Sequence, residues 1–251
     1  MARYQIIIAY DGSGFSGSQR QAKSRTVQSE LEGALTRLGW QGTSVLLAGR
    51  TDSGVHASGQ VAAFDLEWRH PLEKLVDALN GNLPVDMAIS QAKVAADDFH
   101  PRFYATSRRY RYRLFCHTLR DPLRERYAWR IGAQMDGVAL QEAARLFIGK
   151  HDFAAFGTPS RPGSSSVRTI VRAEWQSQGD EWTFEVQADA FLYRMVRKLV
   201  HVQVAVGQGR LSAQAIVDAL AGRPQGIPGG LAPAHGLSLV EVTYPVLASK
   251  D

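Results

Sequence analysis

The strongest constraint on the fold is an order of strand and helix patterns that occurs twice along the chain. In the first half, four β-forming stretches alternate with two amphipathic helical patterns. Thr26 is placed to cap the first helix, and Pro71 is placed to begin the second. The strand patterns lie at 3–10, 45–47, 59–66 and 88–94. The resulting order is β-α-β-β-α-β.

The second half repeats this order without repeating the letters. Asp136 can cap a helix that runs to about Ile148, and a long apolar helix face begins near Ala190. The strand patterns lie at 107–116, 167–176, 181–187 and 237–242, and a shorter helix covers 213–220. The sequence therefore predicts an α/β (α+β) protein of two ferredoxin-like units with mixed, mainly antiparallel sheets. We expect domains at 1–105 and 106–251 with a catalytic cleft between them.

Composition limits the chemistry of the protein. The chain has 251 residues and a formal net charge of +5, with a sequence pI near 9.5 that suits a polyanionic partner but is shared by many proteins. Cys116 is the only cysteine, and the seven histidines lack metal-ligand spacing, so we expect no metal. The apolar run Ile6–Ala9 is too short for a membrane span. The sequence predicts a soluble cytoplasmic protein.

A glycine-bracketed polar loop follows the buried stretch at 45–47. It reads Gly49-Arg50-Thr51-Asp52-Ser53-Gly54-Val55-His56, and it places one carboxylate among an arginine, two hydroxyls and a histidine. The alternative is a plain turn in which Asp52 binds nearby backbone N–H groups. Spacing alone favours the turn, because Asp-Ser-Gly is a common turn sequence.

The strand at 107–116 has two chemically different faces. Alternation places Tyr110 and Tyr112 on one face, and Arg109, Arg111 and Arg113 on the other. One face offers rings for base stacking, and the other offers phosphate contacts. With no acids near them in sequence, the arginines suit contact with an RNA backbone. The alternative is a pair of core tyrosines behind a solvated basic face, and the pattern does not choose between them.

Two further arginines are predicted on the helix that begins near Ala190. Arg194 and Arg197 are three residues apart, so they would be neighbours on its surface. Arg197 lies close to the apolar face and could project into a cleft. The alternative is a surface arginine at the edge of the apolar stripe.

Several motifs in a fixed order give the chain a family resemblance. The most specific is Gly49-Arg50-Thr51-Asp52-Ser53-Gly54-Val55-His56. The others are Tyr10-Asp11-Gly12, Asp98-Phe99-His100-Pro101-Arg102-Phe103, Arg108-Arg109-Tyr110-Arg111-Tyr112, His151-Asp152-Phe153, Ala190-Phe191-Leu192-Tyr193-Arg194-Met195-Val196-Arg197 and Gly236-Leu237-Ser238-Leu239. Over nearly its whole length the chain resembles the bacterial tRNA pseudouridine synthase A (TruA-type) family.

This resemblance implies an activity and a set of site residues. It implies a homodimer that isomerises uridine to pseudouridine at positions 38–40 of the tRNA anticodon stem-loop, without a metal or an organic cofactor. Asp52 matches the catalytic aspartate and Tyr110 a tyrosine that stacks on the target base. Arg197 matches an arginine that pairs with the aspartate, and Arg50 one that helps to displace the target nucleotide. The alternatives are a non-catalytic RNA-binding module and an aspartate-dependent small-molecule enzyme.

Some positions depart from the family pattern. Ser18 stands within a segment that usually reads Gly-Trp-Gln, and Asp189 replaces a small neutral residue or Asn. Lys198 and His201 replace the usual Asn and Gly. These changes leave Asp52, Tyr110 and Arg197 in place but put the local RNA contacts in doubt. The sequence leaves open whether Asp52 attacks the base, attacks the ribose or removes a proton.

Overall fold

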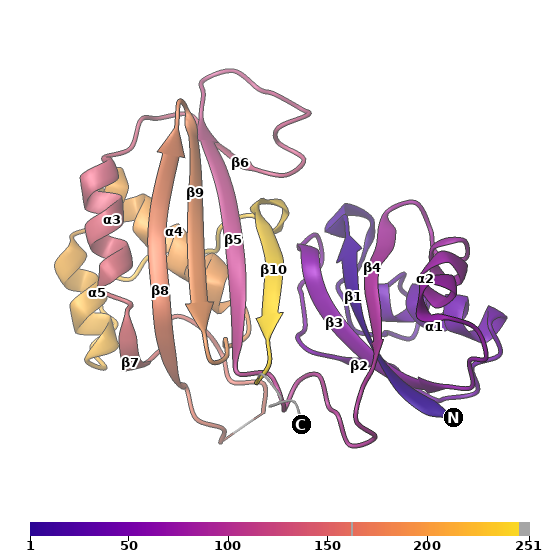
Figure 1. The fold of residues 1–251 in the computed structure, drawn as a ribbon. Helices are drawn as coiled ribbons and strands as arrows, with labels where there is room; N and C mark the ends of the chain where they lie inside the picture. The colour runs from indigo at the N-terminus through magenta and orange to yellow at the C-terminus, as the bar shows by residue number, and fades with distance from the viewer. Residues whose placement is uncertain (162, 246–251) are drawn as a thin grey trace. The chain divides into compact units, whose positions relative to one another are not determined.

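The computed structural model describes residues 1–161 and 163–245 (Figure 1). The chain divides into two compact units, one of Met1–Thr106 with the stretch from Leu239 onward and one of Ser107–Ser238. Among the described residues no helix has the length and apolar character that a membrane crossing needs.

The first unit contains an antiparallel sheet built around its first strand. The strands β1 (Ala2–Tyr10), β3 (His56–Leu66) and β4 (Met87–Val94) run in the order β4-β1-β3, and β1 is antiparallel to both neighbours. The short β2 (Leu46–Leu47) pairs with β3, and β10 (Leu237–Thr243) is a further neighbour of β3. With α1 (Val27–Arg37) and α2 (Leu72–Asn80), the predicted β-α-β-β-α-β order of the first half is confirmed.

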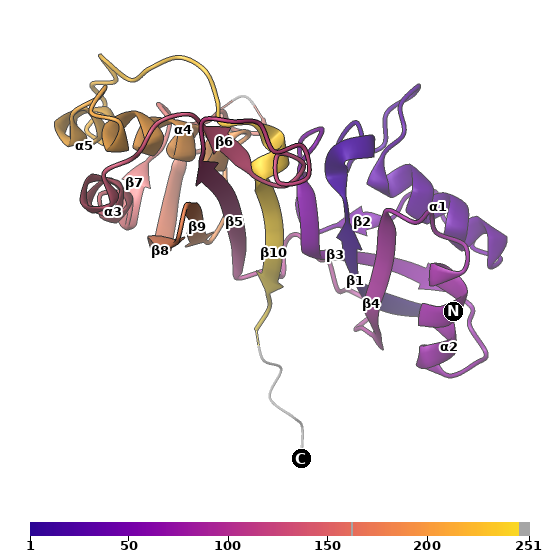
Figure 2. The ribbon, with the colours of Figure 1, turned by 90° about the horizontal axis from the view of Figure 1, so that it is seen from above.

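Alternating apolar residues explain how this unit is layered. Every second residue of β1 from Tyr4 to Tyr10 is buried, and α1 and α2 cover one face of the sheet (Figure 2). The predicted cap of α1 is confirmed, since the Thr26 side chain accepts from the Ser29 amide while the Ser29 side chain accepts from the Thr26 amide.

A glycine allows β10 to approach β3. A Cβ on Gly59 would lie 2.2 Å from the main-chain oxygen of Val240, so only glycine fits at this contact. Through this contact most of β10 belongs to the first unit, whereas the sequence analysis placed the final strand in the domain 106–251.

The second unit has a sheet of order β5-β9-β8-β7 with helices on one face (Figure 1). Its strands are β5 (Ser107–Cys116), β6 (Trp129–Ile131), β7 (Gly149–Asp152), β8 (Val167–Gln178) and β9 (Glu181–Ala188). Its helices are α3 (Gly137–Arg145), α4 (Met195–Gly207) and α5 (Ala213–Leu220), followed by a short 3-10 turn, η2 (Ala234–Gly236). The four main strands pair antiparallel, and β6 runs parallel to β5.

The structure adds two short strands to this half and shortens one predicted helix. The strands β6 and β7 were not predicted, because three or four residues are too few to show an alternating pattern. Helix α3 ends at Arg145, three residues before the predicted end at Ile148.

Helix α4 begins at Met195 rather than near Ala190. Tyr193 exchanges two backbone hydrogen bonds with Thr158, and Arg194 has a left-handed φ of 62°, so the chain turns into the helix only after Arg194. The predicted placement of Arg194 and Arg197 as neighbours on one helix is therefore wrong.

Candidate active site

The loop that carries Asp52 joins β2 to β3. It turns through a backbone hydrogen bond from the Val55 amide to the main-chain oxygen of Asp52, at 3.1 Å. Gly54, the third residue of this turn, has a φ of 78°, as a type II turn requires. This hydrogen bond closes the turn through the main chain and does not use the Asp52 carboxylate. Asp52 is half-buried, and Arg50 in the same loop is exposed.

A second segment, residues 12–18, packs against this loop. A Cβ on Gly12 would lie 2.1 Å from the Val55 oxygen, and a Cβ on Gly17 would lie 2.9 Å from the Thr51 oxygen. The main-chain oxygen of Phe15 accepts from the Ser53 hydroxyl at 3.1 Å. This support was not predicted from the sequence, although Gly12 and Gly17 mark the positions where the two backbones approach each other.

Thr51, the residue before Asp52, is held on three sides. It is 7% exposed, its amide donates to the Ser18 hydroxyl at 2.9 Å, and its oxygen accepts from the Ser18 amide at 3.1 Å. The Thr51 hydroxyl lies 2.8 Å from the Tyr10 hydroxyl. Burial raises the pKa of Tyr10 to about 12, despite its hydrogen bonds to Thr51 and Gln60, so this hydroxyl stays protonated at neutral pH.

His56 closes the far end of the loop. It is buried, and its Nδ1 atom lies 3.0 Å from the Gly12 amide and 3.2 Å from a carboxylate oxygen of Asp11. Nδ1 accepts from Gly12 when unprotonated and donates to Asp11 when protonated. Both contacts join the end of the loop to the segment that follows β1.

The two tyrosines of β5 are both buried. Tyr112 is fully buried and donates from its hydroxyl to the Pro233 oxygen at 2.9 Å, so it is a core residue. Tyr110 is 8% exposed, and its ring meets the Phe191 ring nearly edge-on, with centroids 5.2 Å apart. Tyr110 thus lies at the border of the core, next to Phe191 of the motif at 190–197.

Arg197 is fixed by the segment that precedes β10. Its Nε atom donates to the Ala232 oxygen at 2.8 Å, while its own main-chain oxygen accepts from the Ala232 amide at 3.1 Å. Burial raises the pKa of Tyr112, and the nearby positive charge of Arg197 opposes that rise. Arg197 is half-buried in the second unit, together with Tyr110, whereas Asp52 and Arg50 belong to the first unit.

The basic face of β5 is paired with acids, contrary to the sequence analysis. Glu185 on β9 lies 2.6 Å from Arg111, 3.3 Å from Arg109 and 3.2 Å from Arg172. Arg113 lies 3.4 Å from Glu181. The absence of acids near these arginines in sequence was misleading, because pairing of β5 with β9 sets Arg111 directly opposite Glu185, 74 residues away. The premise for a dedicated phosphate-binding face is therefore wrong.

Replacing Glu185 tests how much this cluster stabilises the second unit. Burial pushes the pKa of Glu185 up, but Arg111, Arg109 and Arg172 outweigh it, so the pKa lies below its ordinary value. Glu185→Gln should lower the free energy of unfolding by about 1–3 kcal/mol, because three arginines lose their shared anion. Glu181 gives the control, because its side chain is 42% exposed and pairs with Arg113 and Arg124 at the surface, and Glu181→Gln should cost only about 0–1 kcal/mol.

The pH dependence of this effect has a defined sign. A depressed carboxylate pKa stabilises the fold above the unfolded-state value of about 4.3, and this contribution is lost as the pH falls through the lower folded-state pKa. The free energies of unfolding of wild type and Glu185→Gln, measured with denaturant, should therefore converge as the pH falls. A gap that stays constant down to low pH would contradict the ion-pair explanation.

Two of the departures from the family pattern make structural contacts in the second unit. The Asp189 carboxylate accepts from the amides of Thr169 and Ala190, at 3.1 and 2.6 Å, at the end of β9. The Lys198 ammonium donates to the main-chain oxygens of Pro228 and Gly230, and burial lowers its pKa. These two residues hold loops within the unit.

The described part of the chain has no cluster of three or more His, Cys, Asp or Glu residues able to hold a metal ion.

A family model described as tRNA pseudouridine synthase matches residues 6–104 and 143–245. The chain belongs to the tRNA pseudouridine synthase family. The matched segments of this synthase family contain Asp52 and Arg197, and Tyr110 falls between them.

Curated relatives extend the similarity over nearly the full chain. A tRNA pseudouridine synthase A of Chloroflexus aurantiacus is 42% identical over 98% of this chain and 90% of its own length. The protein of the same name from Limosilactobacillus fermentum is 40% identical over 97% of this chain and 96% of its own length. The one from Methylacidiphilum infernorum is 42% identical over 96% of this chain and 95% of its own length. A solved archaeal box H/ACA sRNP complex matches at 12% identity and a TM-score of 0.36, over 81% of this chain and 44% of the other, a likeness too low to support an argument.

Proposed function

We propose that this chain is a tRNA pseudouridine synthase that isomerises uridine at positions 38–40 of the anticodon stem-loop. The proposal rests on family membership over nearly the whole chain. It is supported by the Asp52 loop, which backbone hydrogen bonds hold within the first unit. The reaction breaks the bond between ribose C1′ and uracil N1 and forms one from C1′ to uracil C5. N1 gains a proton and C5 loses one, so no oxidant, reductant or cofactor is required. A tRNA substrate supports the proposal that the enzyme acts in the cytoplasm.

Each proposed site residue has a separate role. Asp52 acts on the base or the ribose as a nucleophile or a base. Arg197 orients this carboxylate and offsets the cost of covering it with the target base. Arg50 helps to displace the target nucleotide, which costs a few kcal/mol to unstack, and stacking on Tyr110 returns about 1–3 kcal/mol.

Tritium release tests the activity and separates it from simple RNA binding. The C5 proton of uridine leaves during the reaction, so tRNA labelled with tritium at C5 should release label into water. Wild-type protein should release label in proportion to the uridines converted. Binding of tRNA without release would instead support the alternative, a non-catalytic RNA-binding module.

Tyr110 is expected to act mainly through its ring. Tyr110→Phe should keep tRNA affinity and turnover near wild type, because it keeps the stacking surface and the edge contact with Phe191. Tyr110→Ala should weaken the reaction by about 5–150-fold, corresponding to the loss of about 1–3 kcal/mol of stacking. Single-turnover tritium release measures both variants. If Tyr110→Phe is as inactive as Tyr110→Ala, the hydroxyl takes part in the chemistry.

We also propose that the enzyme works as a homodimer whose RNA surface spans both subunits. This proposal rests on the family resemblance and on a weakly basic chain of +5 formal charge. Light scattering at assay concentration should give twice the mass of the 27.6 kDa chain. A monomer that is fully active on intact tRNA would contradict it.

A further inference from the structure

Ser18 is a buried hydroxyl at the base of the Asp52 loop. It is 0% exposed, and its amide and its hydroxyl both face Thr51. The Ser18 amide donates to the Thr51 oxygen, and the Ser18 hydroxyl accepts from the Thr51 amide. This pair of bonds resembles a strand bridge in which a side chain takes the place of one main-chain oxygen. Ser18 therefore fixes both polar backbone groups of the residue before Asp52.

The segment that carries Ser18 is itself attached to helix α1. The Gln28 amide, in the first turn of α1, donates to the Ser18 oxygen at 3.0 Å, and the Val27 amide donates to the Gly17 oxygen at 3.3 Å. The first amides of a helix lack partners within the helix, so these bonds satisfy them. The backbone on which Ser18 lies is thus held by a regular element.

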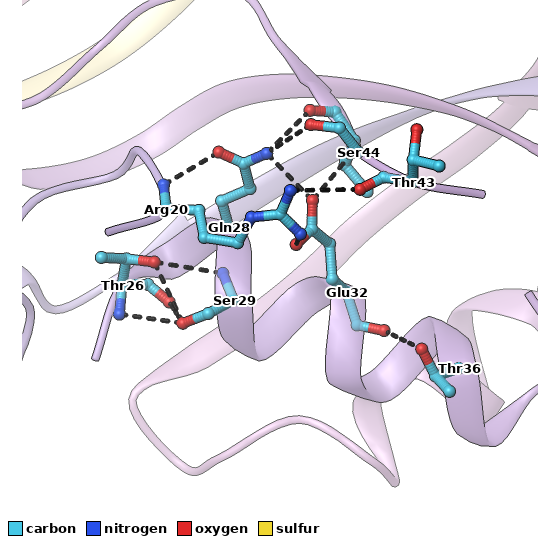
Figure 3. A network of polar contacts seen from close by, with 9 residues as sticks. Arg20, Thr26, Gln28, Ser29, Glu32, Thr36, Thr43 and Ser44 are labelled. Atoms are coloured by element: carbon cyan, nitrogen blue, oxygen red, sulfur yellow. Dashed lines mark hydrogen bonds and ion pairs between the residues drawn. The ribbon is translucent and has the colours of Figure 1, made fainter. Parts of the chain in front are cut away.

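A buried polar network fixes the other side of this segment (Figure 3). The Gln28 side-chain oxygen accepts from the Arg20 amide at 2.9 Å, and the Gln28 side-chain nitrogen donates to Glu32 at 2.9 Å. Glu32 also accepts from the Arg20 guanidinium at 2.8 Å and from the Val45 amide at 3.0 Å. The polar contacts therefore run without interruption from Glu32 through Gln28 and Ser18 to Thr51.

We propose that Ser18 is a positioning residue for Asp52. Its hydroxyl holds the Thr51 amide, and so sets the backbone from which the Asp52 carboxylate projects. This inference rests on the proposed function, in which Asp52 makes the catalytic contact. Without the hydroxyl, the buried Thr51 amide has no acceptor at this point, and the loop must shift to find one. Reaction rates are sensitive to such shifts, since a displacement of about 1 Å can cost about 100-fold.

Ser18→Ala is the direct test. At saturating tRNA and a temperature where every variant is folded, its single-turnover rate of tritium release should fall about 10–100-fold. Its tRNA affinity should stay within about twofold of wild type, because the loop shifts without removing an RNA contact. A purely structural role would lower the melting temperature without lowering the rate constant of the folded protein.

Ser44→Ala is the matched control. The Ser44 hydroxyl accepts from the Gln28 side chain in the same network, but it lies outside the Asp52 loop, so its loss should leave the rate unchanged. If Ser18→Ala does not fold, Ser18→Cys takes its place, because a thiol is a weaker acceptor and should also slow the reaction. A wild-type rate in either folded variant would overturn the proposal.

Asp52→Asn, run in parallel, separates this proposal from the function on which it rests. An active Asp52→Asn protein would refute the catalytic assignment itself. An inactive Asp52→Asn protein beside a fully active Ser18→Ala protein would refute only the positioning role. Loss of rate in both variants, with the Ser44→Ala rate unchanged, supports both.

Discussion

Asp52→Asn should abolish turnover while leaving the fold and tRNA affinity nearly intact. A carboxamide is a far poorer nucleophile and base than a carboxylate, so the rate should fall by about 10²–10⁴-fold or more, the range that a positioned acid or base contributes. Asparagine keeps the shape of the side chain, and the turn at 52–55 is closed by the main-chain oxygen of Asp52. The variant should therefore melt close to wild type.

An exposed carboxylate of the same unit provides the control. Asp77 on α2 makes a surface ion pair with Lys74 at 3.2 Å, and Asp77→Asn should leave turnover unchanged. Single-turnover tritium release measures both variants, with filter binding for affinity and thermal melting for the fold. Asp52→Asn activity within tenfold of wild type would contradict a catalytic role for Asp52.

Gly12→Ala should damage both the stability and the activity of the protein. The added Cβ would lie 2.1 Å from the Val55 oxygen and 2.4 Å from the Val55 carbonyl carbon, so the backbone of one segment has to move. Overpacking of this kind costs about 1–3 kcal/mol and sometimes more. Displacement of the loop that carries Asp52 should lower the rate by about 100-fold.

Gly33→Ala is the matched control for this substitution. Gly33 lies within α1, and a Cβ there would meet nothing within 4 Å. This variant should gain about 0.5–1 kcal/mol of stability, because alanine is the better helix former, and its rate should not change. Denaturant unfolding and single-turnover tritium release measure both variants. A Gly12→Ala protein with wild-type stability and rate would mean that the contact between residues 12 and 55 is not needed.

Local signals explain which parts of the fold were predictable. Thr26 with Ser29 and Asp136 cap helices as predicted, because capping depends on residues three or fewer positions away. The strands expected at 167–176 and 181–187 are observed as β8 and β9, and Gly179 in the turn between them has a φ of 61°. Each of these features is encoded within a few consecutive residues.

Contacts between distant residues explain the failures. The start of α4 is set by backbone bonds from Tyr193 to Thr158, 35 residues earlier, and sequence periodicity does not show them. Glu185 meets Arg111 only because β5 pairs with β9. The sequence marked Ser18 as a departure from its family, but its bonds to Thr51, 33 residues away, appear only in the fold.

The Asp52 loop combines a feature that the sequence predicts with one that only the fold reveals. Its motif was visible in the sequence, because the carboxylate, the arginine and the glycines are contiguous. Its support by Gly12, Gly17 and Ser18 was not visible, because these contacts join residues more than 30 positions apart in the sequence. The chemistry of the loop was therefore predicted locally, while the rigidity of the loop comes from a segment more than 30 residues away.

Mapping of pseudouridine in tRNA tests whether this protein forms pseudouridine and whether it needs the Asp52 carboxylate to do so. Unmodified tRNA is incubated with wild-type protein or with Asp52→Asn, and mass spectrometry then locates pseudouridine in each product. We expect new pseudouridine at positions 38–40 with wild-type protein and none with Asp52→Asn. Pseudouridine absent from both products, confined to other positions, or equal in the two would contradict this expectation.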